Sequence, residues 1–156
     1  MRFQVVPAAY VLLLREVSGR PQMLLQLRRN TGYYDGHWAA AAAGHVEAGE
    51  SVLEAAVREA AEEIGVTIEA SDLEPVTVMH RTQGTGDPID ERVDFFFVCR
   101  RWSGEPTIIE PEKCAGLEWY GFDALPDPVV PHELAVLGSL SRGEALPAVL
   151  PYGFEA

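Results

Sequence analysis

The sequence predicts an α+β fold in which several strands surround one strong helix. Short apolar stretches alternate with turn-forming residues, and one segment has amphipathic helical spacing. The 156 residues are 47% apolar, which excludes disordered, collagen-like and coiled-coil chains. Because a chain of this length is the size of one domain, we expect residues 1–156 to form a single domain with its own core.

The first part of the chain is predicted to form a β-hairpin followed by a loop. Apolar residues dominate Val5–Leu14 and Met23–Leu27, and residues 18–21 between them have turn chemistry. Asn30–Gly36 is rich in glycine, tyrosine and polar residues, which indicates a loop. Ala39–Ala43 has helical propensity but is too short to decide by pattern, so helix and strand are equally supported there.

Ser51–Ile64 has the clearest helical pattern in the chain. Apolar residues recur at helical spacing, and glutamates with one arginine fill the positions between them. Ser51 is placed to cap the N-terminus, with Glu54 three residues later to complete a capping box. Gly65 is placed to end the helix.

The C-terminal half is predicted to contain three more strands and a second helix. The strands are expected at Leu73–Arg81, Arg92–Arg101 and Leu117–Phe122. Residues 83–88 between the first two read as a loop because of their glycines and proline. A cluster of prolines precedes the second helix, which is expected at about His132–Ser141.

The composition argues against a broad basic surface for nucleic acid. The 24 acidic residues outnumber the 12 basic ones and give a formal charge of −12, whereas phosphate-based binding needs clustered lysine and arginine. The longest apolar runs are too short for a membrane span, and the N-terminal one lacks the flanks of a signal peptide. Cys99 and Cys114 are expected to be ordinary thiols, which favours the cytoplasm.

Acidic residues are concentrated in Gly44–Val66, which holds six glutamates and one arginine. On a helix, Glu59 lies one turn from both Glu62 and Glu63, so the three carboxylates can converge. Taken alone, the pattern is explained by salt bridges of the arginine with Glu54 and Glu62 on a solvated helix face. The alternative is a site for a hard divalent cation such as Mg²⁺, which prefers oxygen ligands.

The whole segment GHVEAGESVLEAAVREAAEEIGV resembles the Nudix box, the signature of the Nudix hydrolase family. All glycine and charged positions of that box are present, at Gly44, Glu50, Arg58, Glu59, Glu62, Glu63 and Gly65. The resemblance implies an α/β/α sandwich, with a mixed sheet between helices and a catalytic loop–helix–loop at residues 44–66. It also implies a bound Mg²⁺ or Mn²⁺.

The resemblance assigns roles to the box residues by position. The implied metal ligands are the Gly44 carbonyl and the carboxylates of Glu59, Glu62 and Glu63. Glu59 or Glu62 would act as general base, Arg58 would orient the catalytic carboxylates, and Glu50 would lie behind them. These roles suit attack of water on phosphorus, which needs a metal to spread charge and a carboxylate to take a proton.

The implied reaction is hydrolysis of a nucleoside diphosphate linked to another group. Residues 110–113, 117–120 and 125–126 are similar to the EPEK…WEW…LP stretch of MutT-like nucleoside triphosphate pyrophosphohydrolases. We therefore expect a nucleoside triphosphate, ordinary or oxidised, to be cleaved to monophosphate and pyrophosphate by a monomer or homodimer. The alternatives are a nucleotide sugar or dinucleoside polyphosphate as substrate, and a nucleotide-binding module without catalysis.

Further candidate substrate-binding residues lie outside the box. Arg28 or Arg29 is expected to touch substrate phosphate, since they lie on a strand that resembles the one preceding the box in nucleotide-hydrolysing members. Glu91 is a candidate extra carboxylate, and Glu112 and Lys113 belong to the stretch that lies near the nucleotide pocket in MutT-like enzymes. Aromatic residues that can stack on a base, although such residues more often belong to the core or rim, are Tyr33, Tyr34, Trp38 and Phe96.

Two other features bear on the site. The histidines have no metal-binding spacing, and only His80 with Arg81, at a predicted strand end, is placed to meet a ligand. Trp38 is followed by five alanines where the family commonly has Leu-Pro-Gly-Gly or similar. This departure is expected to change the loop shape and substrate choice, but not the metal-binding glutamates.

Overall fold

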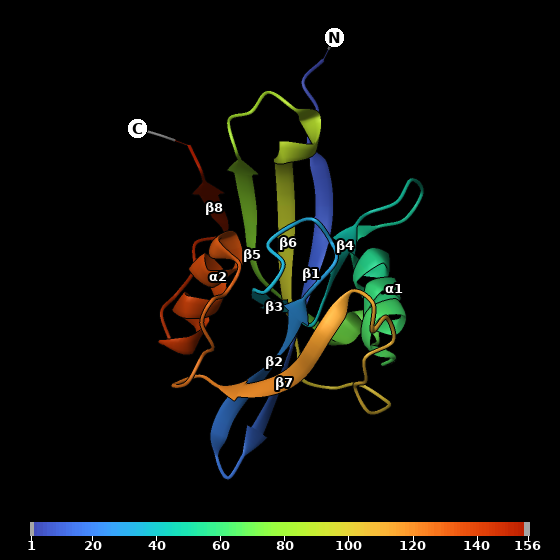
Figure 1. The fold of residues 1–156 in the computed structure, drawn as a ribbon, viewed down its shortest axis with the longest axis vertical. Coiled ribbons are helices and arrows are strands. Elements are labelled where there is room, and N and C mark those ends of the chain that lie inside the picture. The colour runs from blue at the N-terminus through green and yellow to red at the C-terminus, as the bar shows by residue number, and fades with distance from the viewer. Residues whose placement is uncertain (1, 155–156) are drawn as a thin grey trace.

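The computed structural model describes residues 2–154, which form an eight-stranded mixed sheet with one helix on each face (Figure 1). The strand order is β3-β2-β1-β6-β5-β8, and β4 pairs with β1 while β7 pairs with β2. The elements are β1 (Val6–Val17), β2 (Arg20–Arg28), β3 (Trp38–Ala40), β4 (Ala42–His45), α1 (Val52–Ile64), β5 (Leu73–Thr82), β6 (Glu91–Cys99), β7 (Cys114–Gly121), α2 (Pro131–Ser141) and β8 (Val149–Tyr152), with short 3₁₀ turns at Ala70–Asp72 and Pro88–Asp90. The α/β/α arrangement expected from the sequence is confirmed.

Strand β1 lies at the centre and is buried on both faces. Its residues alternate between the two core clusters. Those on the α1 side are Ala9, Val11 and Leu13, and those on the α2 side are Ala8, Tyr10, Leu12 and Leu14. β1 runs parallel to β6 and antiparallel to β2 and β4. A strand that is buried on both faces reads as an unbroken apolar run, as this segment does.

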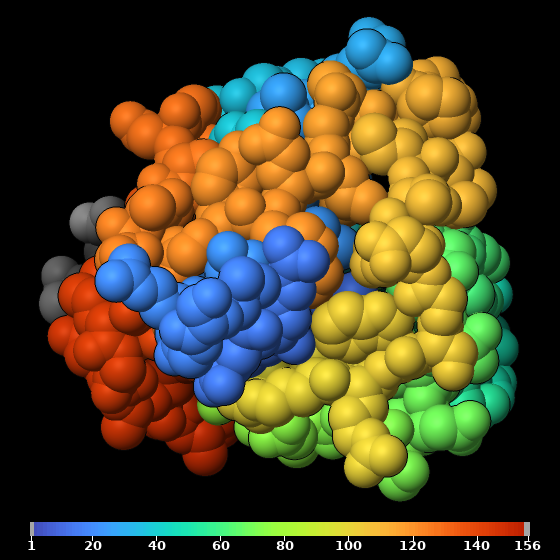
Figure 2. All heavy atoms as spheres, turned by 90° about the horizontal axis from the view of Figure 1, so that it is seen from below, coloured from blue at the N-terminus to red at the C-terminus, as the bar shows by residue number. Residues whose placement is uncertain are grey.

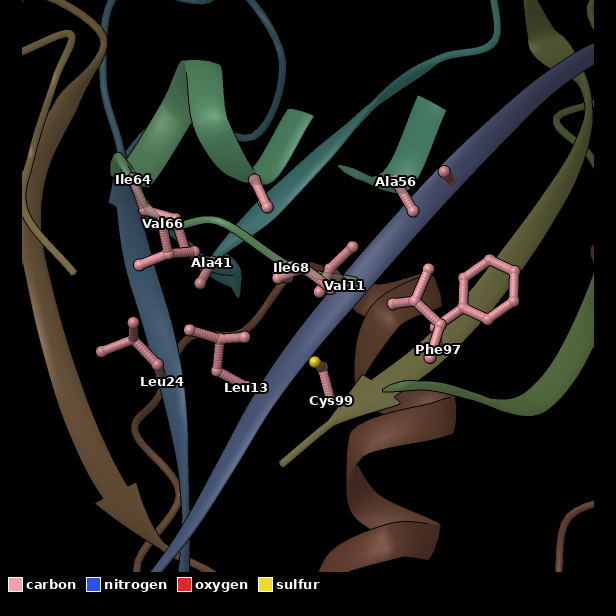
Figure 3. Close-up of a cluster of buried hydrophobic side chains, with 14 of the residues drawn as sticks. Val11, Leu13, Leu24, Ala41, Ala56, Ile64, Val66, Ile68, Phe97 and Cys99 are labelled. Carbon is pink, nitrogen blue, oxygen red and sulfur yellow. The ribbon is translucent and has the colours of Figure 1, made fainter. Parts of the chain in front are cut away.

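Helix α1 is fixed at both ends and packs closely on the sheet. Ser51 Oγ accepts a hydrogen bond from the Glu54 N–H at 3.1 Å, Glu54 accepts one from the Ser51 N–H at 3.2 Å, and Gly65 adopts φ 68°. Small buried residues on the inner face let the helix approach the strands. Figure 3 shows this cluster, with Ala56 and Ile64 pointing from α1 toward the sheet.

The alanine run is strand, which settles the alternative that the sequence left open. It forms β3 and β4 with a break at Ala41; β3 pairs with β2 and β4 with β1. Ala39 to Ala42 are at most 2% exposed, so their backbone groups need partners inside the protein. Pairing with two neighbouring strands supplies those partners and overrides the helical propensity of alanine.

The remaining differences from the sequence expectation concern element ends and one strand. β1 continues to Val17, β6 ends at Cys99, and α2 begins at Pro131. β8 was not predicted; it is four residues long, includes a proline, and pairs parallel to β5 at the sheet edge. So short a segment has too few residues to show a strand period.

The end of the molecule seen in Figure 2 is formed by the β1–β2 hairpin, which protrudes between β7 and the segment after β6. A cavity of about 240 Å³ lies there, next to Pro21 and Phe122. Cys99 is buried and Cys114 is half-buried, and both are free thiols. Within residues 2–154, none of the helices is long and apolar enough to cross a membrane.

Candidate functional site

One groove joins two cavities of about 700 and 450 Å³. The two share the lining residues Gln26, Arg28, Thr31, Ala43, Gly44 and His45. We call the first cavity the carboxylate end, because Glu59 and Glu63 line it. We call the second the arginine recess, because Arg81 and Arg92 line it together with Arg28.

At the carboxylate end, Glu59 and Glu63 lie one helical turn apart and line the same cavity. Glu63 Oε2 accepts hydrogen bonds from the Ala43 N–H at 3.1 Å and from Gln26 Nε2 at 3.3 Å. Burial raises the pKa of Glu63 well above its usual value, and the charge of Glu59 raises it further. Two free negative charges are therefore unfavourable here, and a cation would relieve their repulsion.

Gly44 is required where it is because Glu59 lies against its backbone. A Cβ at this position would lie 2.2 Å from Glu59 Oε1, so any other residue would displace the carboxylate. Strand β4 thus brings a backbone segment up to two clustered carboxylates. Clustered oxygen donors whose negative charges repel one another fit a hard divalent ion such as Mg²⁺ or Mn²⁺.

Arg58 connects the glutamates of the box. Its Nε and Nη2 donate to the two carboxylate oxygens of Glu50 at 3.0 and 2.7 Å. Its Nη1 donates to Glu59 at 2.7 Å and to Glu62 at 3.2 Å, and Nη2 also donates to the His45 carbonyl at 3.0 Å. Hydrogen bonding of the Arg58 guanidinium to the Glu50 carboxylate is the main cause of the raised pKa of Arg58. This guanidinium therefore holds Glu59 in place.

The three box carboxylates do not all converge as the helical spacing suggested. Glu62 has a side chain that is 56% exposed, and it shares the Arg58 Nη1 donor with Glu59, whereas Glu63 is bonded to Ala43 and Gln26. Within residues 2–154, no three acidic, histidine or cysteine side chains form a ready-made metal cluster. The expectation of a Glu54–Arg58 salt bridge is also wrong, because the Glu54 carboxylate accepts a hydrogen bond from the N–H of the N-cap residue Ser51 instead.

Of the substrate-binding candidates, Arg28 and Lys113 lie in the groove. Arg28 lines both cavities, and its Nε donates to the Tyr33 carbonyl at 2.7 Å while Nη2 donates to Thr31 Oγ1 at 3.0 Å. Lys113 lines the carboxylate end and lies 3.8 Å from Glu110. These two cations are therefore available to an anionic ligand there.

The other three candidates lie outside the groove. Arg29 follows the last residue of β2, and its exposed guanidinium donates to the Pro111 carbonyl. Glu112 is exposed and lines neither cavity. The Glu91 carboxylate accepts a hydrogen bond from Thr82 Oγ1 across the β5–β6 pair, so this carboxylate bonds within the sheet.

The aromatic candidates separate in the same way. Tyr33 lines the arginine recess. Phe96 is 1% exposed and stacks on Tyr10 with ring centroids 4.5 Å apart, so it belongs to the core. Trp38 packs edge-on against Tyr120, and Tyr34 lines neither cavity.

Sequence reasoning missed a buried polar network beneath the arginine recess. Asp94, which is fully buried, forms an ion pair with Arg81, which is 3% exposed. Burial raises the pKa of Asp94, and Arg81 opposes that rise. The signal available in the sequence was an aspartate inside the apolar strand RVDFFFV, since a charge on a buried strand needs a partner.

Helix α2 adds two more residues to this network. Glu133 Oε1 accepts a hydrogen bond from the Ala40 N–H at 2.7 Å, and burial raises the pKa of Glu133 to about 7. His132 Nε2 lies 3.1 Å from the Tyr10 hydroxyl, and burial together with nearby arginines lowers the pKa of His132 to about 3. His132 is therefore neutral, and His80 instead packs against Phe154 away from the groove.

Comparisons with known proteins agree with this architecture. A family model described as the NUDIX domain matches residues 5–138. A MutT NUDIX hydrolase from Burkholderia pseudomallei is 27% identical, with a TM-score of 0.73 over 86% of this chain and 97% of that one. The mMutator MutT protein from Bacillus halodurans is 24% identical, with a TM-score of 0.69 over 91% and 86%. The NUDIX domain of Shewanella oneidensis NrtR, complexed with ADP ribose, is 14% identical, with a TM-score of 0.68 over 90% and 88%.

Proposed function

The chain belongs to the NUDIX domain family and is a hydrolase of pyrophosphate bonds, and from this premise we propose that it cleaves a nucleoside triphosphate, ordinary or oxidised, to the monophosphate and pyrophosphate. We propose that it does so with bound Mg²⁺ or Mn²⁺. The MutT names of similar structures and the 110–126 stretch support this choice of substrate.

The observation that carries the proposal is the position of Glu59 and Glu63 against the Gly44 backbone, in a groove that also holds Arg28 and Lys113. Glu59, Glu63 and the Gly44 carbonyl would hold the metal. When bound, the metal would neutralise phosphate charge and lower the pKa of a water molecule. In a chain of charge −12, this cation makes the acidic end attractive to a polyphosphate.

The chain's own residues supply the remaining chemistry. Arg58 fixes Glu59, so that this carboxylate keeps its direction during the reaction. Glu62 is largely exposed and bonded only to Arg58 at 3.2 Å, which leaves it free to take the proton of the attacking water. Arg28 and Lys113 would orient the phosphates, and Glu50 keeps Arg58 in place through two hydrogen bonds.

A nucleotide sugar or dinucleoside polyphosphate is the second candidate substrate. The observation that favours it is the length of the groove, because the arginine recess extends beyond the carboxylate end. The NrtR domain complexed with ADP ribose has the same fold. A related alternative is a domain that binds such a nucleotide without hydrolysing it.

A substrate panel distinguishes these candidates. Nucleoside triphosphates with and without an oxidised base, nucleotide sugars, dinucleoside polyphosphates and capped RNA are incubated with Mg²⁺ or Mn²⁺, and the phosphate products are identified. Monophosphate with pyrophosphate is the expected result. Preferential cleavage of nucleotide sugars overturns the triphosphate assignment, and no turnover of any compound favours the binding module.

Substitution of the proposed base tests whether α1 is the catalytic helix. Glu62→Gln should abolish most of the turnover of the best substrate, by roughly 100-fold or more. Full activity of this variant would contradict metal-assisted catalysis by α1. A cytoplasmic monomer or homodimer stays a prediction, and light scattering of the purified chain tests its assembly.

A further inference from the structure

The arginine recess contains more cationic side chains than the proposed reaction uses. Arg28, Arg81 and Arg92 line this one cavity of about 450 Å³, although the whole chain has only 12 lysines and arginines. They come from β2, β5 and β6, so the fold brings together charges that are distant in the sequence. This concentration in an acidic chain requires an explanation.

Two of these arginines are direct neighbours across the sheet. Arg81 on β5 pairs with Arg92 on β6 in the antiparallel register, so their side chains leave the same face. Like charges directly opposite one another destabilise a strand pair. A bound anion would offset this repulsion.

Only Arg81 of the pair forms a hydrogen-bonded ion pair in the part of the chain that the structure describes. Asp94 Oδ2 accepts the hydrogen bond from Arg81 Nε, whereas Arg92 acts on Asp94 only through its charge. Arg92 Nε is buried and has no hydrogen-bond partner among residues 2–154, and Arg92 Nη1 donates to the Ile89 carbonyl at 3.5 Å. A buried donor without a partner costs free energy, which a ligand acceptor would recover.

No other ionisable group that lines the recess forms a salt bridge with Arg92 within residues 2–154. His132 is uncharged, since burial and the three arginines lower its pKa to about 3. Glu133 is only partly ionised near neutral pH, because burial raises its pKa to about 7. Asp90 also lines the recess, and its Oδ2 accepts a hydrogen bond from Thr85 Oγ1 at 2.7 Å and not from Arg92.

We propose that the arginine recess is an oxyanion site, in which Arg92 with Arg28 and Arg81 binds the phosphate or carboxylate that lies beyond the cleaved diphosphate of the substrate. A planar guanidinium matches these groups with two parallel hydrogen bonds. In a nucleoside triphosphate this group is the terminal phosphate, and in a nucleotide sugar it is an acidic group on the sugar. The assignment rests on the proposed function, in which the diphosphate occupies the carboxylate end.

Binding of inorganic phosphate tests the site without relying on activity. The measurement is calorimetry in EDTA, because without a divalent cation the glutamates of the carboxylate end repel phosphate. The parent protein should bind phosphate, Arg92→Gln should weaken binding by about 10-fold, and Arg92→Lys should weaken it less. Arg100→Gln, which removes an exposed arginine paired with Glu74, is the matched control and should bind as the parent does.

Paired substrates then identify the source of the anion. With Mg²⁺, kcat/KM is compared for a nucleoside triphosphate and its diphosphate, and for UDP-glucuronate and UDP-glucose. The parent should prefer the member with the extra anion, and Arg92→Gln should reduce that preference by about 10-fold. If phosphate binds but neither pair shows a preference, the ligand is free phosphate and the substrate assignment is wrong.

Two other outcomes separate this proposal from the proposed function. If no compound is hydrolysed but phosphate binding still depends on Arg92, the oxyanion site stands and the proposed function fails. If the parent hydrolyses substrates but binds phosphate no better than Arg92→Gln does, the oxyanion site is overturned. Stabilisation by uncharged guanosine in place of phosphate would also overturn it, because the recess would then hold a base.

Discussion

The two ends of the groove are built in opposite ways. At the carboxylate end, glutamates from one helix and the loop before it share a single arginine, and that arginine makes five hydrogen bonds. In the arginine recess, arginines from three strands face few carboxylates, and Arg92 Nε and Asp94 Oδ1 are buried without partners in residues 2–154. The first end is prepared for a cation and the second for an anion.

The largest effect is expected where the carboxylate end loses a ligand. Glu59→Gln should lower kcat by roughly 1,000-fold in an assay of released phosphate, because the amide binds a divalent cation poorly. Glu54→Gln is the matched control on the same helix, since glutamine also completes a capping box. Comparable losses of kcat in both variants would mean that activity depends on the net charge of α1 and not on the carboxylate of Glu59.

The recess is expected to depend most on its buried counter-ion. Asp94→Asn leaves Arg81 buried without its charged partner, so the free energy of unfolding should fall by about 3 kcal/mol in urea denaturation. Glu74→Gln removes an exposed ion pair with Arg100 and should cost less than about 1 kcal/mol. Equal costs would show that the Arg81–Asp94 pair gains nothing from burial.

A third variant tests the close approach of backbone and carboxylate. Gly44→Ala should reduce kcat by about 100-fold with the fold retained, since the new Cβ would lie 2.2 Å from Glu59 Oε1. Gly116→Ala places a Cβ 3.4 Å from Trp38 in another strand and should keep most of the activity. Circular dichroism verifies that both variants fold.

The last of these effects depends on pH. Burial raises the pKa of Glu133 from 4.5 to about 7, so the folded state keeps a proton that the unfolded chain releases between these values. The free energy of unfolding therefore falls as the pH rises through this range. Glu133→Gln removes this dependence and should be more stable than the parent by about 3 kcal/mol above pH 7.

The sign of that change with pH makes the prediction specific. The advantage of Glu133→Gln should shrink as the pH falls and disappear near pH 4, where the carboxyl is protonated in both the folded and the unfolded state. Urea denaturation of both proteins from pH 4 to pH 8 measures it. An advantage that is constant over this range would mean that Glu133 does not titrate as described.

The difference between the carboxylate end and the arginine recess explains how much of the site the sequence could predict. The helix, its caps and Arg58 with its glutamates follow local spacing rules, and the structure has them where the sequence placed them. The exact directions of the three carboxylates did not follow from the sequence, because helical spacing places side chains on one face but does not choose their rotamers. Glu62 bonds to Arg58, whereas Glu63 bonds to Ala43 and Gln26.

The arginine recess had no such local signal. Arg81 and Arg92 become neighbours only through the β5–β6 register, and Glu133 reaches the site from a helix near the other end of the chain. Strand pairing of this kind depends on contacts between distant segments, which a single sequence does not display. The choice of Arg28 over Arg29 likewise depended on where β2 ends and on which segment each side chain meets.

The alanine run has a consequence for the size of ligand that the groove accepts. Ala39, Ala40 and Ala43 line the arginine recess, so part of its wall consists of single methyl groups. Valine at position 43 would fill space at the junction of the two cavities without changing any charge. The room for the substrate and the chemistry performed on it are therefore set by different residues, and either can change in evolution while the other is kept.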